Sequence, residues 1–120
     1  MITLKNNTDI IALAKRTIQI ESTAISDLIK SIDSEFAQAV KLIYKSKGRV
    51  VITGIGKSAN IANKIVATLN STGTPAIFMH AADAIHGDLG MVTPDDVFLA
   101  LSNSGETDEV IKLIPFLRDN

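Results

Sequence analysis

Residues 49–54 read Arg-Val-Val-Ile-Thr-Gly, a short β-branched apolar run that a glycine closes. Such a run, apolar without alternation, is typical of a strand buried on both faces of a parallel sheet. The next residues, Ile-Gly-Lys-Ser at 55–58, form a glycine-containing loop. The stretch from Ser58 to Leu69 then predicts a helix that ends at the polar segment 70–73. Together these residues predict the strand–loop–helix start of an α/β fold.

Two further strands are predicted downstream, at Ala76–Met79 and Val97–Leu101, with a polar, partly helical segment between them. The tail from Glu106 to Arg118 has a helical pattern, which Pro115 should kink or end early because it cannot donate a hydrogen bond to Ile111. This alternation predicts a doubly wound parallel sheet between two layers of helices, a three-layer αβα, flavodoxin-like arrangement. Three strands leave an open edge, so we expect the first part of a larger domain.

The residues before the first strand show a helical pattern. Thr8 or Asp9 is the expected N-cap. Apolar residues then recur at spacings of three, four and seven, namely Ile18, Ile25, Ile29, Ile32, Phe36, Val40 and Ile43. The stripe is long for one globular helix, and the cap-type side chains of residues 31–34 predict two helices that meet there.

The end of this helical region is also marked in the sequence. Lys45, Lys47 and Gly48 predict the C-terminus of the second helix. We therefore expect a helical arm over residues 1–47 and a βαβ core over residues 48–120. The apolar face of the arm is expected to pack either on its own domain or on another subunit.

Composition excludes several classes of protein. A chain of 120 residues suffices for one compact domain. Twelve Lys and Arg against 13 Asp and Glu give a net charge of −1, which is too little positive charge for a nucleic-acid partner. The absence of cysteine excludes disulfides and thiolate chemistry and suits a reducing cytosol. Because neither a signal peptide nor a run of about 18 apolar residues is present, we expect a cytoplasmic protein without a membrane partner.

Polar residues follow each predicted strand, where an open parallel sheet binds its ligands. In the loop after the third strand, Ser102, Ser104 and Thr107 place three hydroxyls before a helix N-terminus, an arrangement that suits a phosphate monoester. The alternative is that Ser102 or Ser104 only caps the helix. Glu106, expected in the first helical turn, either complements the helix dipole or acts as a base or hydroxyl ligand beside the phosphate.

The loop after the first strand resembles two nucleotide motifs only weakly. Gly54-x-Gly56-x-x-Ala59 fits a dinucleotide pattern, but the tip of the second strand, Met79-His80, lacks the ribose-binding carboxylate. A P-loop would need a glycine where Val51 stands. Lys57 in this loop either is a solvated surface residue or holds a phosphate, polarises a carbonyl or moves a proton.

The segment after the second strand contains the two histidines of the chain. A neutral imidazole at His86 suits proton relay near neutral pH. His86 with Asp83 or Asp88 is a poor metal signal, so no metal is expected. His80, at the strand tip, is expected to be structural.

The motifs taken together resemble the SIS (sugar isomerase) domain of bacterial D-arabinose 5-phosphate isomerases. They are Gly54-Ile55-Gly56-Lys57-Ser58, Ser71-Thr72-Gly73-Thr74-Pro75, His86-Gly87-Asp88-Leu89-Gly90-Met91 and Ser102-Asn103-Ser104-Gly105-Glu106-Thr107. The resemblance runs from about Gly48 to the end of the chain. It implies interconversion of ribulose 5-phosphate and arabinose 5-phosphate through an enediol, without a cofactor, at the entry to Kdo synthesis for lipopolysaccharide or capsule.

The resemblance also implies roles for single residues. Ser58, Ser102, Ser104 and Thr107 would bind the phosphate, Lys57, Glu106 and His86 would be catalytic, and Gly56, Asp83, Asn103 and Gly105 would shape the substrate loops. The family assembles as homotetramers, and its domain continues with further strands that carry another catalytic Glu and a His. Asp83 stands where well-known members have Glu. The alternative function is a non-catalytic SIS module that binds a phosphosugar and regulates a partner.

Overall fold

The computed structural model describes residues 6–118. The chain forms two compact units, residues 1–40 and residues 41–120. Each unit is described by itself.

The first unit is helical. It contains α1 (Asn7–Asp27), the 3₁₀ turn η1 (Leu28–Ser31) and the start of α2 (Ser34–Lys45), so the predicted pair of helices that meet near residues 31–34 is confirmed. The predicted N-cap at Thr8 or Asp9 is wrong. Asn6 caps α1, because its Oδ1 accepts a hydrogen bond from the Asp9 N–H at 2.9 Å, and both predicted caps lie inside the first turn.

The second unit is built on a parallel sheet of strand order β2-β1-β3 within the described chain. The strands are β1 (Val50–Gly54), β2 (Ala76–His80) and β3 (Val97–Ala100). The first and last residues of each strand lie within one residue of those predicted. All five residues of β1 are buried, as the apolar run predicted, because β1 is the central strand.

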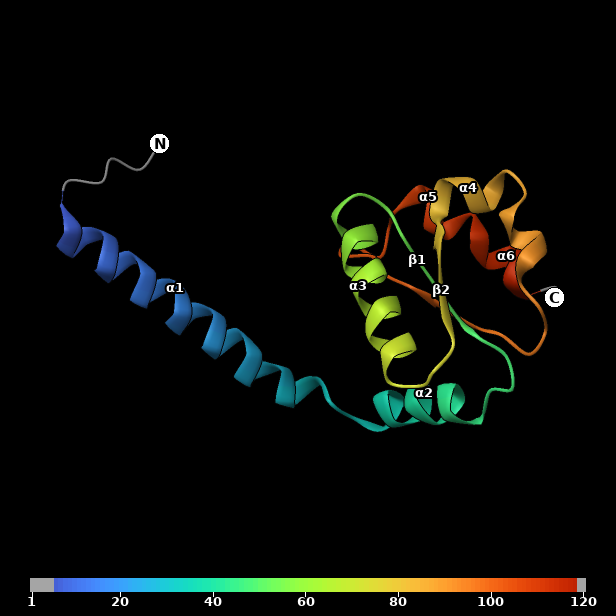
Figure 1. The fold of residues 1–120 in the computed structure, drawn as a ribbon, viewed down its shortest axis with the longest axis horizontal. Helices are drawn as coiled ribbons and strands as arrows, with labels where there is room; N and C mark the ends of the chain where they lie inside the picture. Colours follow the sequence, from blue (N-terminus) through green and yellow to red (C-terminus); the bar gives the residue numbers. More distant parts are fainter. Residues whose placement is uncertain (1–5, 119–120) are drawn as a thin grey trace. The chain divides into compact units, whose positions relative to one another are not determined.

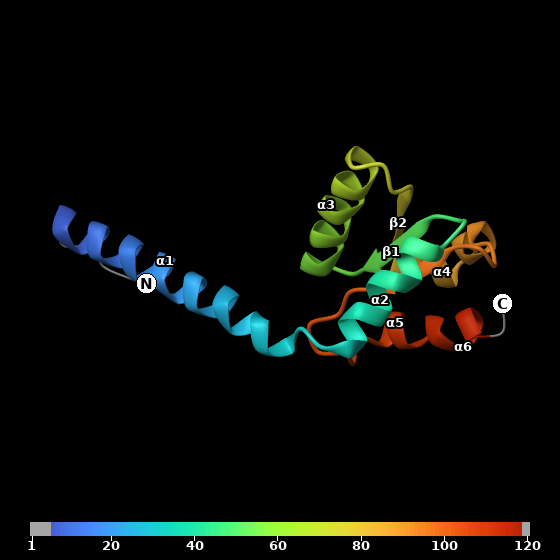
Figure 2. The same ribbon diagram turned by 90° about the horizontal axis from the view of Figure 1, so that it is seen from below.

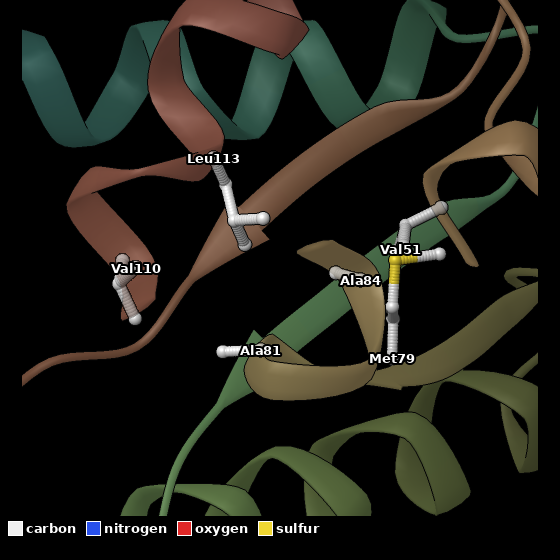
Figure 3. Packing of buried hydrophobic residues seen from close by; sticks show 6 residues of the cluster. All are labelled: Val51, Met79, Ala81, Ala84, Val110 and Leu113. Carbon is white, nitrogen blue, oxygen red and sulfur yellow. The ribbon is translucent and has the colours of Figure 1, made fainter. Parts of the chain in front are cut away.

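Helices cover both faces of this sheet (Figures 1 and 2). On one face, α3 (Lys57–Ser71) packs through Ala62 against Val50 and Ile52 of β1. On the other face lie α4 (Ala81–Ile85), α5 (Asp108–Ile111) and α6 (Leu113–Arg118). Their buried residues form one cluster with residues of β1 and β2. Figure 3 shows its members, which are Val51, Met79, Ala81, Ala84, Val110 and Leu113. The predicted three-layer arrangement is confirmed.

The C-terminal helical region differs from its prediction in one respect. The region divides at Lys112 into α5 and α6, and Pro115 lies in the first turn of α6, where it has no N–H for the Ile111 carbonyl. However, helix begins at Asp108 rather than at Glu106, and Thr107 is its N-cap. Residues 102–106 remain a turn because the serine hydroxyls of this loop bind its own backbone N–H groups.

An ion pair joins β1 and β3 at the amino edge of the sheet. The Arg49 Nη2 atom lies 2.9 Å from Oδ2 of Asp96, and the Asp96 side chain is only 1% exposed. The backbones also meet closely here, because a Cβ at Gly48 would lie 2.5 Å from the carbonyl carbon of Asp95. The side-chain hydrogen bond from Arg49 holds the pKa of Asp96 well below its ordinary value.

Candidate active site

The loops that carry the candidate residues begin at one edge of the sheet (Figure 1). Gly54 pairs with His80, and the Leu101 N–H donates to the Thr53 carbonyl at 2.9 Å, so the three strands end at the same level. Since β1 is central, the loop after it is flanked by the segments that follow β2 and β3. The loops predicted to carry the candidate site thus begin at one edge of the sheet.

The loop after β1 brings Lys57 and Ser58 to the start of α3. Gly56 precedes the helix with φ of +57°, a conformation that favours glycine. A Cβ at Gly54 would lie 2.9 Å from the backbone of Ser58, so only glycine allows this close approach of strand and helix. Lys57 is exposed and Ser58 is half-buried. Lys57 and Ser58 are therefore the first two residues of α3, at the carboxyl edge of the sheet.

The loop after β3 is organised by its own hydroxyls. Ser102 Oγ lies 2.9 Å from Thr107 Oγ1 and accepts a hydrogen bond from the Gly105 N–H at 3.0 Å. Ser104 Oγ accepts from the Glu106 N–H at 3.1 Å. Within residues 6–118 neither serine bonds an N–H of α5, so the alternative that one of them only caps this helix is wrong.

These hydrogen bonds leave the hydroxyl protons available. An oxygen that accepts from a backbone N–H can still donate its own O–H. Among residues 6–118, Ser104 therefore has one hydroxyl proton without an acceptor. Ser102 and Thr107 use one proton for the bond between them, which leaves a second one free there. Gly105 permits the turn through its φ of +72°. The loop presents preformed hydroxyl donors of the kind that an anionic oxygen accepts from.

The third loop also carries Asn103 and Glu106, both of which are exposed. Glu106 lies directly before the N-cap Thr107 rather than inside the first helical turn. The predicted placement of Glu106 in the first helical turn is therefore wrong, whereas its two predicted roles stay open.

The segment after β2 places its two histidines differently. His80 is the N-cap of α4, and its Nδ1 accepts from the Ala82 N–H at 3.3 Å, as its expected structural role requires. His86 is exposed at the other end of α4, where its N–H donates to the Asp83 carbonyl at 2.9 Å. Asp83 is exposed in the first turn of the same helix. Among the described residues, no group of three His, Cys, Asp or Glu side chains is arranged for a metal ion.

A cavity of about 530 Å³ lies beside the later part of the segment between β2 and β3. It is lined by Leu42, Leu89, Gly90, Val92, Thr93, Pro94, Asp96, Val97, Phe98, Phe116 and Leu117. None of the candidate residues belongs to this lining, and Asp96 and Val97 place it at the amino edge of the sheet. The candidate residues follow the carboxyl ends of the strands instead.

Two features of the sheet have no local signal in the sequence. The Thr53 hydroxyl is fully buried and has no hydrogen-bond partner among residues 6–118. The Arg49–Asp96 pair joins residues far apart in the chain, and Arg49 also donates to the Met91 carbonyl at 2.7 Å. Only the pairing of β1 with β3 brings these partners together.

No helix in the described part of the chain has the length and apolar character needed to cross a membrane.

Comparisons with known proteins agree with this architecture. The chain is 50% identical over 115 residues to the arabinose 5-phosphate isomerase KdsD of Pseudomonas aeruginosa, a match that covers 96% of the chain and 35% of that protein. It is 46% identical over 111 residues to KpsF of Escherichia coli O6:H1, which is also named arabinose 5-phosphate isomerase. This match covers 92% of the chain and 34% of that protein. The chain thus spans about a third of the length of these relatives.

A solved structure and a family model match as well. The structure of an Escherichia coli CFT073 protein in complex with arabinose 5-phosphate superposes with a TM-score of 0.89 at 48% identity. The match covers 96% of this chain and 61% of that one, so the chain corresponds to part of the solved domain. The family model described as SIS domain matches residues 42–120. The chain therefore belongs to the SIS domain family.

Proposed function

We propose that this chain forms the phosphosugar-binding part of an enzyme that interconverts D-ribulose 5-phosphate and D-arabinose 5-phosphate. The observation that carries the proposal is the preformed hydroxyl loop of Ser102, Ser104 and Thr107, at the strand ends where an α/β sheet binds ligands. The arabinose 5-phosphate isomerases at 46–50% identity support this choice of substrate. On this proposal, residues 48–120 are the core and residues 1–47 are a helical arm.

The phosphate is proposed to lie against the hydroxyl loop. Ser104 and the Ser102–Thr107 pair offer their free O–H groups to its oxygens. Ser58 adds a hydroxyl from the start of α3. Gly56, Asn103, Gly105 and Asp83 are proposed to shape the surrounding loops.

The reaction moves protons and needs no change of oxidation state overall. From the aldose, a base removes the proton on C2, and the electrons of that bond form the enediol as the C1 carbonyl oxygen takes up a proton. A proton then returns to C1, and the hydroxyl on C2 loses its proton to become the ketone. We assign this proton transfer to Lys57, Glu106 and His86, whose side chains are all exposed and available to a bound sugar. No cofactor or metal enters the proposal.

The setting of the enzyme is proposed from its resemblance to the isomerase family. The resemblance supports a place in the supply of Kdo for lipopolysaccharide or capsule, in the cytoplasm and in a homotetramer. The chain covers only about a third of the relatives it matches, so residues of the remaining part are proposed to complete the active site.

The test is an isomerase assay of the chain alone and of the chain joined to the C-terminal part of the P. aeruginosa relative. We expect the joined protein to be active. Its isomerase activity should fall about 100-fold or more in Lys57→Ala and in Glu106→Ala. Lys64→Ala is the matched control, because Lys64 is an exposed lysine of the same helix. Binding of arabinose 5-phosphate without turnover in the joined protein would instead support a regulatory phosphosugar-binding module.

A further inference from the structure

The segment that carries His86 is held locally by single-turn hydrogen bonds and not by a long helix or a strand. From His86 to Val92 the backbone makes single turns, with the Gly90 N–H donating to the Gly87 carbonyl at 3.0 Å and the Val92 N–H donating to the Leu89 carbonyl at 3.1 Å. Short 3₁₀ turns of this kind are weak by themselves. Gly87, at φ of +134°, adds backbone freedom in the unfolded chain. Support from outside the turn adds to these bonds, and Leu89 and Val92 already pack against the buried cluster that includes Val51.

Arg49 supplies such a support from the amino edge of the sheet, the edge opposite to the candidate site. Its Nη2 atom donates to the Met91 carbonyl at 2.7 Å and to Asp96 Oδ2 at 2.9 Å, and its Nε donates to Asp96 Oδ1 at 3.2 Å. The guanidinium is thus held by two carboxylate oxygens while it binds the end of the 88–91 turn. The planar fork of arginine makes these bonds simultaneously, which a lysine ammonium cannot reproduce in the same geometry.

Asp96 fixes the other side of the same junction. Its carboxylate accepts from the backbone N–H of Arg49 at 2.6 Å and from the Thr93 N–H at 2.9 Å. The side chain is only 1% exposed, so water competes little for these bonds. The carboxylate therefore binds both the backbone at the start of β1 and the backbone of Thr93, two residues after Met91.

We propose that the Arg49–Asp96 pair is a positioning device for the segment 86–91, and through it for His86. The inference rests on the proposed function, because it gives the pair a role in catalysis only if His86 acts on the substrate. Neither Arg49 nor Asp96 lies at the carboxyl edge where the sugar is proposed to bind. They are positioning residues, and their effect reaches the site along the backbone from Met91 to His86.

The test is site-resolved hydrogen exchange on the chain with Arg49→Lys. We expect the single ammonium of lysine to stay beside Asp96, so that the positive charge is kept and the Met91 carbonyl loses its donor. We expect the Gly90 and Val92 amides to exchange about tenfold faster relative to the amides of β1. The His86 ring signals in NMR should shift in the same variant.

Asn70→Ala is the matched control at the same edge of the sheet. The Asn70 amide bonds the N–H and the carbonyl of Ala76 at 2.8 and 2.9 Å and, within residues 6–118, has no bond to the segment 86–91. We expect this variant to change exchange throughout the core without selective loss at Gly90 and Val92. Equal patterns in the two variants, or unchanged exchange in Arg49→Lys, would overturn the inference. Because exchange needs no turnover, a negative isomerase assay would refute the proposed function and leave this result standing.

Discussion

Replacing Asp96 by alanine should destabilise the fold strongly. The carboxylate accepts hydrogen bonds from the backbone N–H groups of Arg49 and Thr93 and from two nitrogens of the Arg49 guanidinium. Removing one partner of a fully buried pair costs about 3–5 kcal/mol. Here the Arg49 side chain is 34% exposed, so water compensates part of the loss and we expect about 2–3 kcal/mol.

The assay is urea unfolding followed by circular dichroism, with Asp27→Ala as control. Asp27 pairs with Lys30 at 2.7 Å, but these side chains are 57% and 81% exposed, so that pair should contribute at most about 1 kcal/mol. If Asp96→Ala and Asp27→Ala lowered the unfolding free energy by the same amount, the argument from burial would be refuted.

The same carboxylate predicts a pH dependence. The pKa of Asp96 is lowered in the folded state, mainly by the hydrogen bond from Arg49, while in the unfolded state it is about 3.9. Its contribution to stability is therefore fully present above that value and is lost as the pH falls below it, because only the unfolded state then binds a proton. Asp96→Asn should flatten the decline in unfolding free energy below about pH 4. A decline of unchanged slope in Asp96→Asn would contradict the prediction.

Two further substitutions test the packing of the core. Gly48→Ala should destabilise by about 1–3 kcal/mol, because its Cβ would lie 2.5 Å from the Asp95 backbone, whereas Gly90→Ala places a Cβ in open space and serves as control in the same urea titration. Thr53→Val should raise the unfolding free energy by about 1 kcal/mol, because it removes a buried hydroxyl without a partner among the described residues. A large loss in Thr53→Val would show that this hydroxyl is bound in solution.

Local patterns in the sequence predicted the elements of the fold well. The unbroken apolar run of β1 indicated a central strand, and Pro115 indicated the division of the last helical region. The loops that follow the strands were predicted as the site because parallel strands end at one edge. Each of these signals lies within a few residues of the feature that it predicts.

Features that depend on distant partners were not predictable in this way. Asp96 follows a turn and looks like any surface carboxylate until β1 and β3 pair and bring Arg49 beside it. The start of α5 was placed too early because the serine hydroxyls compete for backbone N–H groups in the preceding turn. The N-cap of α1 differs from the prediction because Asn6 precedes the residues at which the helix was expected to begin.

The central position of β1 has a consequence for the order in which the chain folds. Val50 pairs with Ala76 on one side and with Val97, almost twice as far along the chain, on the other. The unit of β1, α3 and β2 is therefore the more local one and is expected to assemble first, with β3 joining later. The contact between Arg49 and Asp96 forms only when β3 docks. Loss of Asp96 should consequently accelerate unfolding while leaving the folding rate nearly unchanged, which is the kinetic signature of a contact absent from the transition state.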